Sequence, residues 1–255
     1  IKIIAKIEDR EGVKNIHDIV ALSDGIMVAR GDLGIETDIT DLPNIQRRLV
    51  HASAKGGVRS IVATHLLESM IEHPIPTRAE VTDVANAIYE GVDAVMLSGE
   101  TSVGRYPARC VEQLDKIAKN AERFPGLGYE KALTVSGDKQ HVAVHAVALA
   151  EALNAEGIVV ITRRGVTADF VTSARPHSVP IFAFTNNSQT RRRLALNRAV
   201  SAHRIAFSSD PEKTLQRSFD LLREREGLHK ACKLVVISDV LANQPTEAIQ
   251  IRNLT

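Results

Sequence analysis

Lys6 and Glu8 stand at the carboxyl end of a short apolar segment, Ile1–Ile7. Side chains alternate faces along a strand, so Lys6 and Glu8 share one face. Asp32 follows a second apolar segment and comes directly after Gly31. Two carboxylates at adjacent strand ends could hold a hard cation such as Mg²⁺ through oxygen atoms, with room for water and substrate. The alternatives are that Lys6 and Glu8 form a weak ion pair in solvent and that Gly31–Gly34 is an ordinary turn.

Polar residues also follow two later apolar segments. Thr64 and His65 follow one of them, and Ser98–Glu100 follows the other. Thr at such a place is most often a cap, and strand alternation predicts that His65 turns away from the side of Thr64, which favours a structural role for His65. Ser98–Glu100 could be a ligand or a turn, and the spacing does not decide between them. Together the residue types suit a phosphate and a metal ion, without identifying the substrate.

Four short apolar segments position these residues: Ile1–Ile7, Gly25–Ala29, Ser60–Ala63 and Ala94–Leu97. Residues with helical spacing fill the gaps between them. Nearly continuous apolar strands that alternate with helices are typical of a parallel sheet covered on both faces. In such folds the functional groups gather at the carboxyl ends of the strands, which is where the polar residues lie.

A second α/β pattern follows the breaker Pro125–Gly128. The sequence predicts helices over His141–Leu153, from after Gly165 to Ala174, over Ser188–Leu196 and from Asp210 to Gly227, and strands over Gly157–Thr162, Pro180–Phe184 and Lys233–Ser238. We therefore predict two α/β units joined near residue 126, with residues 1–125 in the first and 126–255 in the second.

The composition narrows the class of protein. The 255 residues carry 32 Lys and Arg against 31 Asp and Glu, a net charge of +1, which gives no support for a nucleic-acid-binding surface. No stretch approaches the roughly 20 apolar residues of a membrane span. Two cysteines, Cys110 and Cys232, cannot form a disulfide framework and are expected to be buried thiols in a cytoplasmic protein. The chain opens inside an apolar segment without Met or a signal peptide, so we expect a piece of a longer protein.

Six blocks of this sequence together resemble pyruvate kinase. They occur in the order found in that family and cover residues 1 to about 110 almost without a gap: Ile1–Glu8, Asp24–Gly34, Ala63–Met70, Pro76–Glu80, Asp83–Ala87 and Met96–Thr101. Residues 130–255 resemble the C-terminal domain of the family more weakly. The resemblance implies the second half of a (β/α)₈ TIM barrel, strands five to eight, followed by a smaller α/β domain.

The resemblance also implies an activity, the transfer of a phosphoryl group from phosphoenolpyruvate to ADP in glycolysis, which gives pyruvate and ATP. Lys6 would stabilise the phosphoryl group and the developing enolate, and Glu8 and Asp32 would hold Mg²⁺ or Mn²⁺. The backbone of Gly31 and Asp32 and the hydroxyl of Thr64 would hold the substrate carboxylate. Thr64 would also help to order the donor that protonates the enol carbon.

Two departures from the family pattern bear on this expectation. Asp9 stands where the family usually has Asn, Ser or Thr, and a third acid beside Glu8 could alter metal affinity. The first four strands, the lid domain, the arginine that grips the phosphate and the K⁺ ligands would all precede Ile1. The chain by itself is therefore expected to be inactive, while the intact protein would be a homotetramer.

A second candidate site lies in the C-terminal unit, between a predicted strand and a helix N-terminus. It resembles the family's effector loop, which binds a sugar phosphate, and comprises Thr162, Arg163, Arg164, Gly165 and Thr167. A plain turn with solvated arginines is the alternative. The glycine-rich loop that usually closes over the effector is not evident in Asp239–Glu247.

Two other functions are compatible with the same residues. The chain could be a stand-alone effector-binding or interaction module that kept the motifs and lost catalysis. It could also belong to a different barrel enzyme of the phosphoenolpyruvate and pyruvate group, with Mg²⁺-dependent enolate chemistry.

Overall fold

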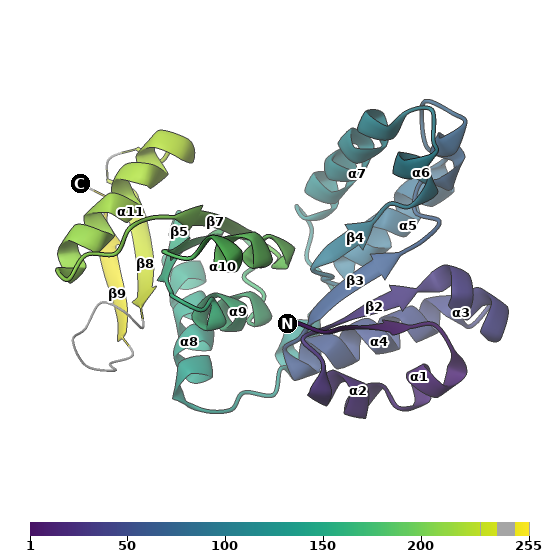
Figure 1. Cartoon of the computed structure of the whole chain (residues 1–255), viewed down its shortest axis with the longest axis horizontal. Coiled ribbons are helices and arrows are strands. Elements are labelled where there is room, and N and C mark those ends of the chain that lie inside the picture. Colours follow the sequence, from purple (N-terminus) through teal and green to yellow (C-terminus); the bar gives the residue numbers. More distant parts are fainter. Residues whose placement is uncertain (230, 239–247, 255) are drawn as a thin grey trace. The chain divides into compact units, whose positions relative to one another are not determined.

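The computed structural model describes residues 1–229, 231–238 and 248–254. The chain forms two compact units, Ile1–Thr134 and Val135–Thr255 (Figure 1). The sequence put the junction near residue 126. Beyond that point the backbone still bonds to the first unit, because Leu127 N–H donates to Tyr89 O and Thr134 N–H to Lys55 O, each at 2.8 Å.

The first unit is built on four parallel strands in the order β1-β2-β3-β4, as the apolar segments predict. The strands are β1 (Ile4–Ile7), β2 (Gly25–Ala29), β3 (Arg59–Ala63) and β4 (Ala94–Met96). The helices are α1 (Arg10–Lys14), α2 (Ile16–Leu22), α3 (Arg30–Glu36), α4 (Leu42–Gly56), α5 (Arg78–Tyr89), α6 (Gly99–Ser102) and α7 (Pro107–Ala121), with 3₁₀ turns η1 (Glu68–Ile71) and η2 (Tyr129–Ala132).

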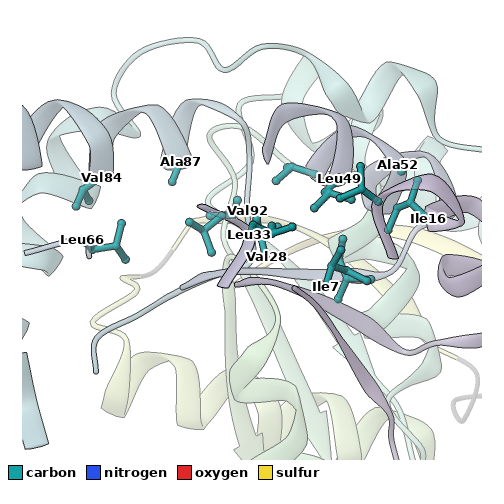
Figure 2. Packing of buried hydrophobic residues seen from close by; sticks show 14 of the residues in the cluster. Ile7, Ile16, Val28, Leu33, Leu49, Ala52, Leu66, Val84, Ala87 and Val92 are labelled. Atoms are coloured by element: carbon teal, nitrogen blue, oxygen red, sulfur yellow. The ribbon is translucent and has the colours of Figure 1, made fainter. Parts of the chain in front are cut away.

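The core of this unit lies between one face of the sheet and its helices. Figure 2 shows Ile7 and Val28 of the strands pointing toward Leu49 and Ala52 of α4. Ile7 is 2% exposed, whereas Lys6 is exposed on the other face of β1. Burial of one face therefore fixes the register of β1 and leaves Lys6 on the face opposite the core.

The second unit has a five-stranded sheet in the order β7-β6-β5-β8-β9. The strands are β5 (Gly157–Ile161), β6 (Ile181–Thr185), β7 (Val200–Arg204), β8 (Lys233–Ser238) and β9 (Ala248–Asn253), and only the β8–β9 pairing is antiparallel. The helices are α8 (Asp138–Ala152), α9 (Val166–Ser173), α10 (Ser188–Arg193) and α11 (Pro211–Arg225), with the 3₁₀ turn η3 (Leu194–Leu196).

Two separate apolar clusters cover the two faces of this sheet. Ile158 of β5 packs with α8 and α9, whereas its neighbour Val159 packs with Leu215 and Phe219 of α11. Asp210 caps α11 by accepting the Glu212 N–H at 3.0 Å, as the sequence predicts. Both faces of the central strands are therefore apolar, which is why these strands read as continuous apolar runs.

The structure also corrects the predicted elements of the second unit. β7 and β9 were not predicted. Both are edge strands of the sheet, and both mix polar with apolar residues, as in Ser201 and His203 of β7. The predicted helix Ser188–Leu196 is α10 followed by η3. The segment Asp239–Glu247 lies outside the described residues. No helix within the described ranges has the length and apolar character that a membrane span requires.

Candidate functional site

The ends of β1 and β2 bring Lys6, Glu8 and Asp32 into contact. The Lys6 ammonium lies 2.8 Å from Asp32 Oδ2 and is also paired with Glu8 Oε2. Each of the three side chains is about half exposed, at 51%, 46% and 52%. The cluster is therefore open to solvent and to a ligand.

Asp32 reaches the cluster because α3 begins directly after β2, with Ala29 as the N-cap residue. Asp32 lies in the first turn of this helix. The N-terminal end of a helix carries a partial positive charge, which favours an ionised carboxylate there. The transition from strand to helix without a loop therefore places a charged Asp32 beside the end of β1.

The charges of Lys6 and Asp32 reinforce each other. The hydrogen bond from Lys6, followed by the charge of its ammonium, holds the pKa of Asp32 below its ordinary value. Hydrogen bonds to Asp32 and then to Glu8 raise the pKa of Lys6 above its ordinary value. The two shifts widen the pH range over which both groups are charged, as a site for a charged phosphate and a cation requires.

The two carboxylates fit a hard divalent cation. Glu8 and Asp32 bind the same ammonium group, so their oxygens already converge on one cation. Oxygen is the donor that Mg²⁺ and Mn²⁺ prefer, and the half-exposed position leaves room for water and substrate as further ligands. Within the described residues, no group of three His, Cys, Asp or Glu side chains is arranged for a metal. The described part of this chain would contribute Glu8 and Asp32 as ligands.

Thr64 borders the same cluster, in an unusual backbone conformation. Its hydroxyl accepts the Gly31 N–H at 2.8 Å and donates to Ala63 O at 2.6 Å. Thr64 and His65 have φ values of 73° and 55°, in the left-handed region. Strand alternation ends there, so the expectation that His65 turns away from the side of Thr64 is wrong.

The side chains of Thr64 and His65 both border Gly31. A Cβ atom placed on Gly31 would lie 3.4 Å from His65 Cε1 and 3.5 Å from Thr64 Oγ1. The His65 side chain is 58% exposed, and its Nε2 lies 3.8 Å from Glu68 Oε1. His65 is thus an exposed neighbour of the cluster.

Two acids that the sequence left open have structural partners. Asp9 caps α1 by accepting the Gly12 N–H at 2.7 Å, and Asn, Ser and Thr are also preferred at that position. Glu100 is 2% exposed and accepts the Leu67 N–H at 3.1 Å and the Ser98 N–H at 2.7 Å. Ser98–Glu100 is therefore the start of α6, with Ser98 as its N-cap residue, and is stabilised by a buried carboxylate.

The two cysteines differ in burial. Cys110 is completely buried, and burial, followed by the charge of Glu100, raises the pKa of its thiol. Cys232 is partly buried. A buried thiol with a raised pKa is inert, which agrees with a packing role for Cys110.

The loop that precedes α9 has a fixed backbone and exposed arginines. Thr162 Oγ1 accepts the Gly165 N–H at 3.1 Å, and Gly165 has a φ of 82° that favours glycine. Arg193 donates to Arg164 O at 2.5 Å. The side chains of Arg163 and Arg164 are exposed.

Thr167, in contrast, is 1% exposed, on the first turn of α9. Of the predicted residues of this loop, the two arginines are thus the ones whose side chains face solvent. A ligand from solution would meet the guanidinium groups first.

Sequence reasoning missed Arg30, the first residue of α3. Arg30 is 8% exposed and donates to Ala63 O, Thr64 O, Gln46 and Asp83. A charged residue at the end of an apolar strand, next to a candidate ligand, is the signal that could have drawn attention to it.

Two family models match the chain. The model of the barrel domain of pyruvate kinase matches residues 1–111, and the model of the pyruvate kinase alpha/beta domain matches residues 140–251. The chain is 39% identical over 262 residues to pyruvate kinase isozyme G, chloroplastic, of Ricinus communis. It is 37% identical over 254 residues to a pyruvate kinase of Methanocaldococcus jannaschii.

The fold is similar to that of a solved structure as well. The crystal structure of a pyruvate kinase from Cryptosporidium parvum matches with a TM-score of 0.93 and 33% identity, over 100% of this chain and 52% of that chain. The two relatives named above are matched over 100% and 99% of this chain, but over 62% and 56% of their own lengths. The chain thus spans between 52% and 62% of the length of these three proteins.

Proposed function

The chain belongs to the pyruvate kinase family, and on that basis we propose that it supplies one side of an active site that transfers the phosphoryl group of phosphoenolpyruvate to ADP, giving pyruvate and ATP. The observation that carries the proposal is the convergence of Lys6, Glu8 and Asp32 on one point, beside Gly31 and Thr64. Phosphoryl transfer depends on positioning and on charge stabilisation, and this cluster offers both a cation and carboxylates that could hold a second one.

Lys6 would lie against the transferring phosphoryl group and stabilise the charge that develops on the enolate oxygen. Glu8 and Asp32 would hold Mg²⁺ or Mn²⁺, which would neutralise charge on phosphoryl and enolate oxygens. The contacts of Lys6 with both carboxylates support this arrangement, because they show that Glu8 and Asp32 can reach the same cation. Lys6 and Asp32 are both charged at neutral pH, and their pairing raises the pKa of Lys6 and lowers that of Asp32, so no proton has to be gained or lost before substrate binds.

The substrate carboxylate would bind at the backbone of Gly31 and Asp32 and at the Thr64 hydroxyl. The Thr64 hydroxyl has one hydrogen, which it gives to Ala63 O, and its oxygen accepts the Gly31 N–H. That hydrogen could turn to a substrate carboxylate while the bond from Gly31 is kept. Thr64 would then also be placed to order the donor that protonates the enol carbon.

We propose further that β1 to β4 are strands five to eight of a (β/α)₈ barrel. Four parallel strands in sequential order, joined by helical connections, support this assignment. At the β1 edge, Ile3 and Ile4 are 59% and 40% exposed, as expected if further strands cover them. Requirement for K⁺, a cytoplasmic location and a homotetramer stay predictions.

The second unit would bind a sugar-phosphate effector at the loop Thr162–Thr167. The exposed guanidinium groups of Arg163 and Arg164, at the start of the eight-residue helix α9, support this proposal. Because Thr167 is buried, a charge introduced there would disturb the loop itself. The two arginines are therefore the residues to change when effector binding is tested.

Coupled production of pyruvate from phosphoenolpyruvate and ADP, with Mg²⁺ and K⁺, tests the catalytic proposal. The intact protein should turn over, and Lys6→Met should lower kcat by about 10²–10³-fold, because it removes a charge that stabilises the transition state. Lys2→Met is the matched control: Lys2 has the same 51% side-chain exposure and is paired with Asp24 at 2.5 Å, near the start of β1. This control should keep normal activity.

Two further measurements complete the test. The chain of residues 1–255 by itself should show no phosphoryl transfer, since Lys6, Glu8, Asp32 and Thr64 stabilise the reaction from one side. Lack of pyruvate production by the intact protein, or normal turnover of its Lys6→Met variant, would refute the proposal. An intact protein that binds a sugar phosphate and makes no pyruvate would instead be a non-catalytic module.

A further inference from the structure

Thr64 adopts a backbone conformation that needs outside support. Its φ of 73° lies in the left-handed region, where a β-branched residue is a genuine outlier. His65, with a φ of 55°, continues the same turn. Strained conformations of this kind persist only where the surrounding structure holds them, and they cluster at functional sites.

Arg30 provides contacts of the required kind. Its Nη2 donates to Thr64 O at 2.6 Å, and its Nε lies 3.3 Å from Ala63 O. The guanidinium group thus bonds to the carbonyls of the two peptide units that flank Thr64, where the chain leaves the extended conformation of β3. The rigid fork of donors on an arginine can serve both carbonyls at once, which a lysine cannot do.

The guanidinium group of Arg30 is itself held by two further side chains. Its Nη1 donates to Asp83 Oδ1 of α5 at 2.7 Å and lies 3.4 Å from Gln46 Oε1 of α4. The Arg30 side chain is 9% exposed, so its charge is largely shielded from water and depends on these partners. Two helices of the core therefore orient Arg30 toward Thr64.

The hydroxyl of Thr64 depends on this arrangement. It bonds to Ala63 O and to the Gly31 N–H, so its position follows from the same peptide unit that Arg30 holds. Gly31 and Asp32 are the residues next to Arg30 in α3. One side chain thus ties the two halves of the candidate carboxylate site, the start of α3 and the end of β3, to each other.

We propose that Arg30 is a positioning residue, which holds Thr64 in its left-handed conformation so that the Thr64 hydroxyl faces Gly31 and the substrate. The expected effect of Arg30 on turnover rests on the proposed function. Its effect on the conformation of Thr64 rests on the geometry alone. Arg30 would act through Thr64, because the partners of its guanidinium group are Ala63 O, Thr64 O, Gln46 and Asp83.

A merely structural ion pair is the competing explanation, and the chain offers a control for it. Arg59, at the start of β3, is 7% exposed and donates to Asp93 Oδ1 and to Gly57 O, each at 3.1 Å. It matches Arg30 in burial and in the types of its partners. Arg59→Lys should therefore lower stability much as Arg30→Lys does, without affecting turnover.

The kinetic test uses the intact protein. Arg30→Lys should lower kcat by about 10–100-fold, the usual effect of losing a group that orients a site residue, with the KM for ADP within about twofold of normal. Thr64→Val should lower kcat to a similar extent. In the double variant the two effects should not multiply, because both changes remove the same positioned hydroxyl.

A structural measurement keeps the inference separate from the proposed function. Hydrogen exchange of the Gly31 amide in the intact protein should speed up in Arg30→Lys and stay normal in Arg59→Lys, whether or not the protein makes pyruvate. If Arg30→Lys fails to fold, Asp83→Asn weakens the same anchor more gently and should show the same pattern. Unchanged Gly31 exchange, multiplying kinetic effects, or an equal loss of kcat in Arg59→Lys would overturn the inference.

Discussion

Changing Glu100 to Gln tests whether this acid is structural. The Glu100 carboxylate is 2% exposed, and each of its oxygens accepts one backbone N–H, from Leu67 and from Ser98. A glutamine amide has one acceptor oxygen, so one of these N–H groups would face an NH₂ donor. A buried donor left without an acceptor costs about 1–3 kcal/mol.

The carboxylate is itself costly to bury, and the neutral amide avoids part of that cost. We therefore expect the free energy of unfolding to fall by a value in the lower half of this range. Glu100→Ala should be worse, because it leaves both N–H groups without an acceptor. The bond to Leu67 also fixes the loop that follows Thr64, so the loss should be accompanied by faster hydrogen exchange in that loop.

Urea unfolding followed by circular dichroism measures the loss. Glu112→Gln is the control, because Glu112 is exposed on α7 and its change should stay within about 0.5 kcal/mol of the wild type. The affinity for Mn²⁺ should not change in Glu100→Gln. A variant as stable as the control would show that the hydrogen bonds of Glu100 were misjudged. A variant that loses metal binding without losing stability would show that Glu100 is a ligand.

Two other predictions concern the ligands. Glu8→Gln or Asp32→Asn in the intact protein should weaken Mn²⁺ binding by at least about tenfold, measured by electron paramagnetic resonance, and lower turnover by orders of magnitude, because each removes a charged metal ligand. Asp9→Asn is the control and should change the affinity for Mn²⁺ little, since Asp9 caps α1. Equal effects at Asp9 and Glu8 would contradict the assignment of Glu8 as a ligand. The double change Arg163→Ala with Arg164→Ala should abolish sugar-phosphate binding, measured by calorimetry. The control Arg217→Ala removes a guanidinium group bonded to Ala206 O and should leave the binding unchanged. Binding that survives the double change would place the effector elsewhere.

The juxtaposition of Lys6, Glu8 and Asp32 could be predicted from local rules. Alternation along a strand puts Lys6 and Glu8 on one face, and parallel strands bring their carboxyl ends to one edge. Both rules need only a few neighbouring residues. They were sufficient to place Asp32 near Lys6, which the structure shows at 2.8 Å.

The edge strands of the second unit could not be predicted from such local rules, and the reason is physical. A central strand is apolar on both faces and stands out from the sequence, as in β5 and β6. Ser201 and His203 of β7 instead bond to Glu226, which follows α11, so their polar character reflects a tertiary contact. A short segment with such polar residues resembles a loop until its partners are known.

Thr64 and Arg30 show where local rules stop. The left-handed turn at Thr64 is unfavourable for an isolated Thr, so no propensity predicts it, and strand alternation gave the wrong side for His65. The turn at Thr64 is supported by Arg30, which lies 34 residues earlier in the sequence. Arg30 in turn depends on Asp83, which lies 53 residues after it. Electrostatics alone requires that a buried arginine have partners. The identity of those partners depends on the packing of α4 and α5 against the sheet, and so the least predictable geometry of the site depends on contacts between residues far apart in the sequence.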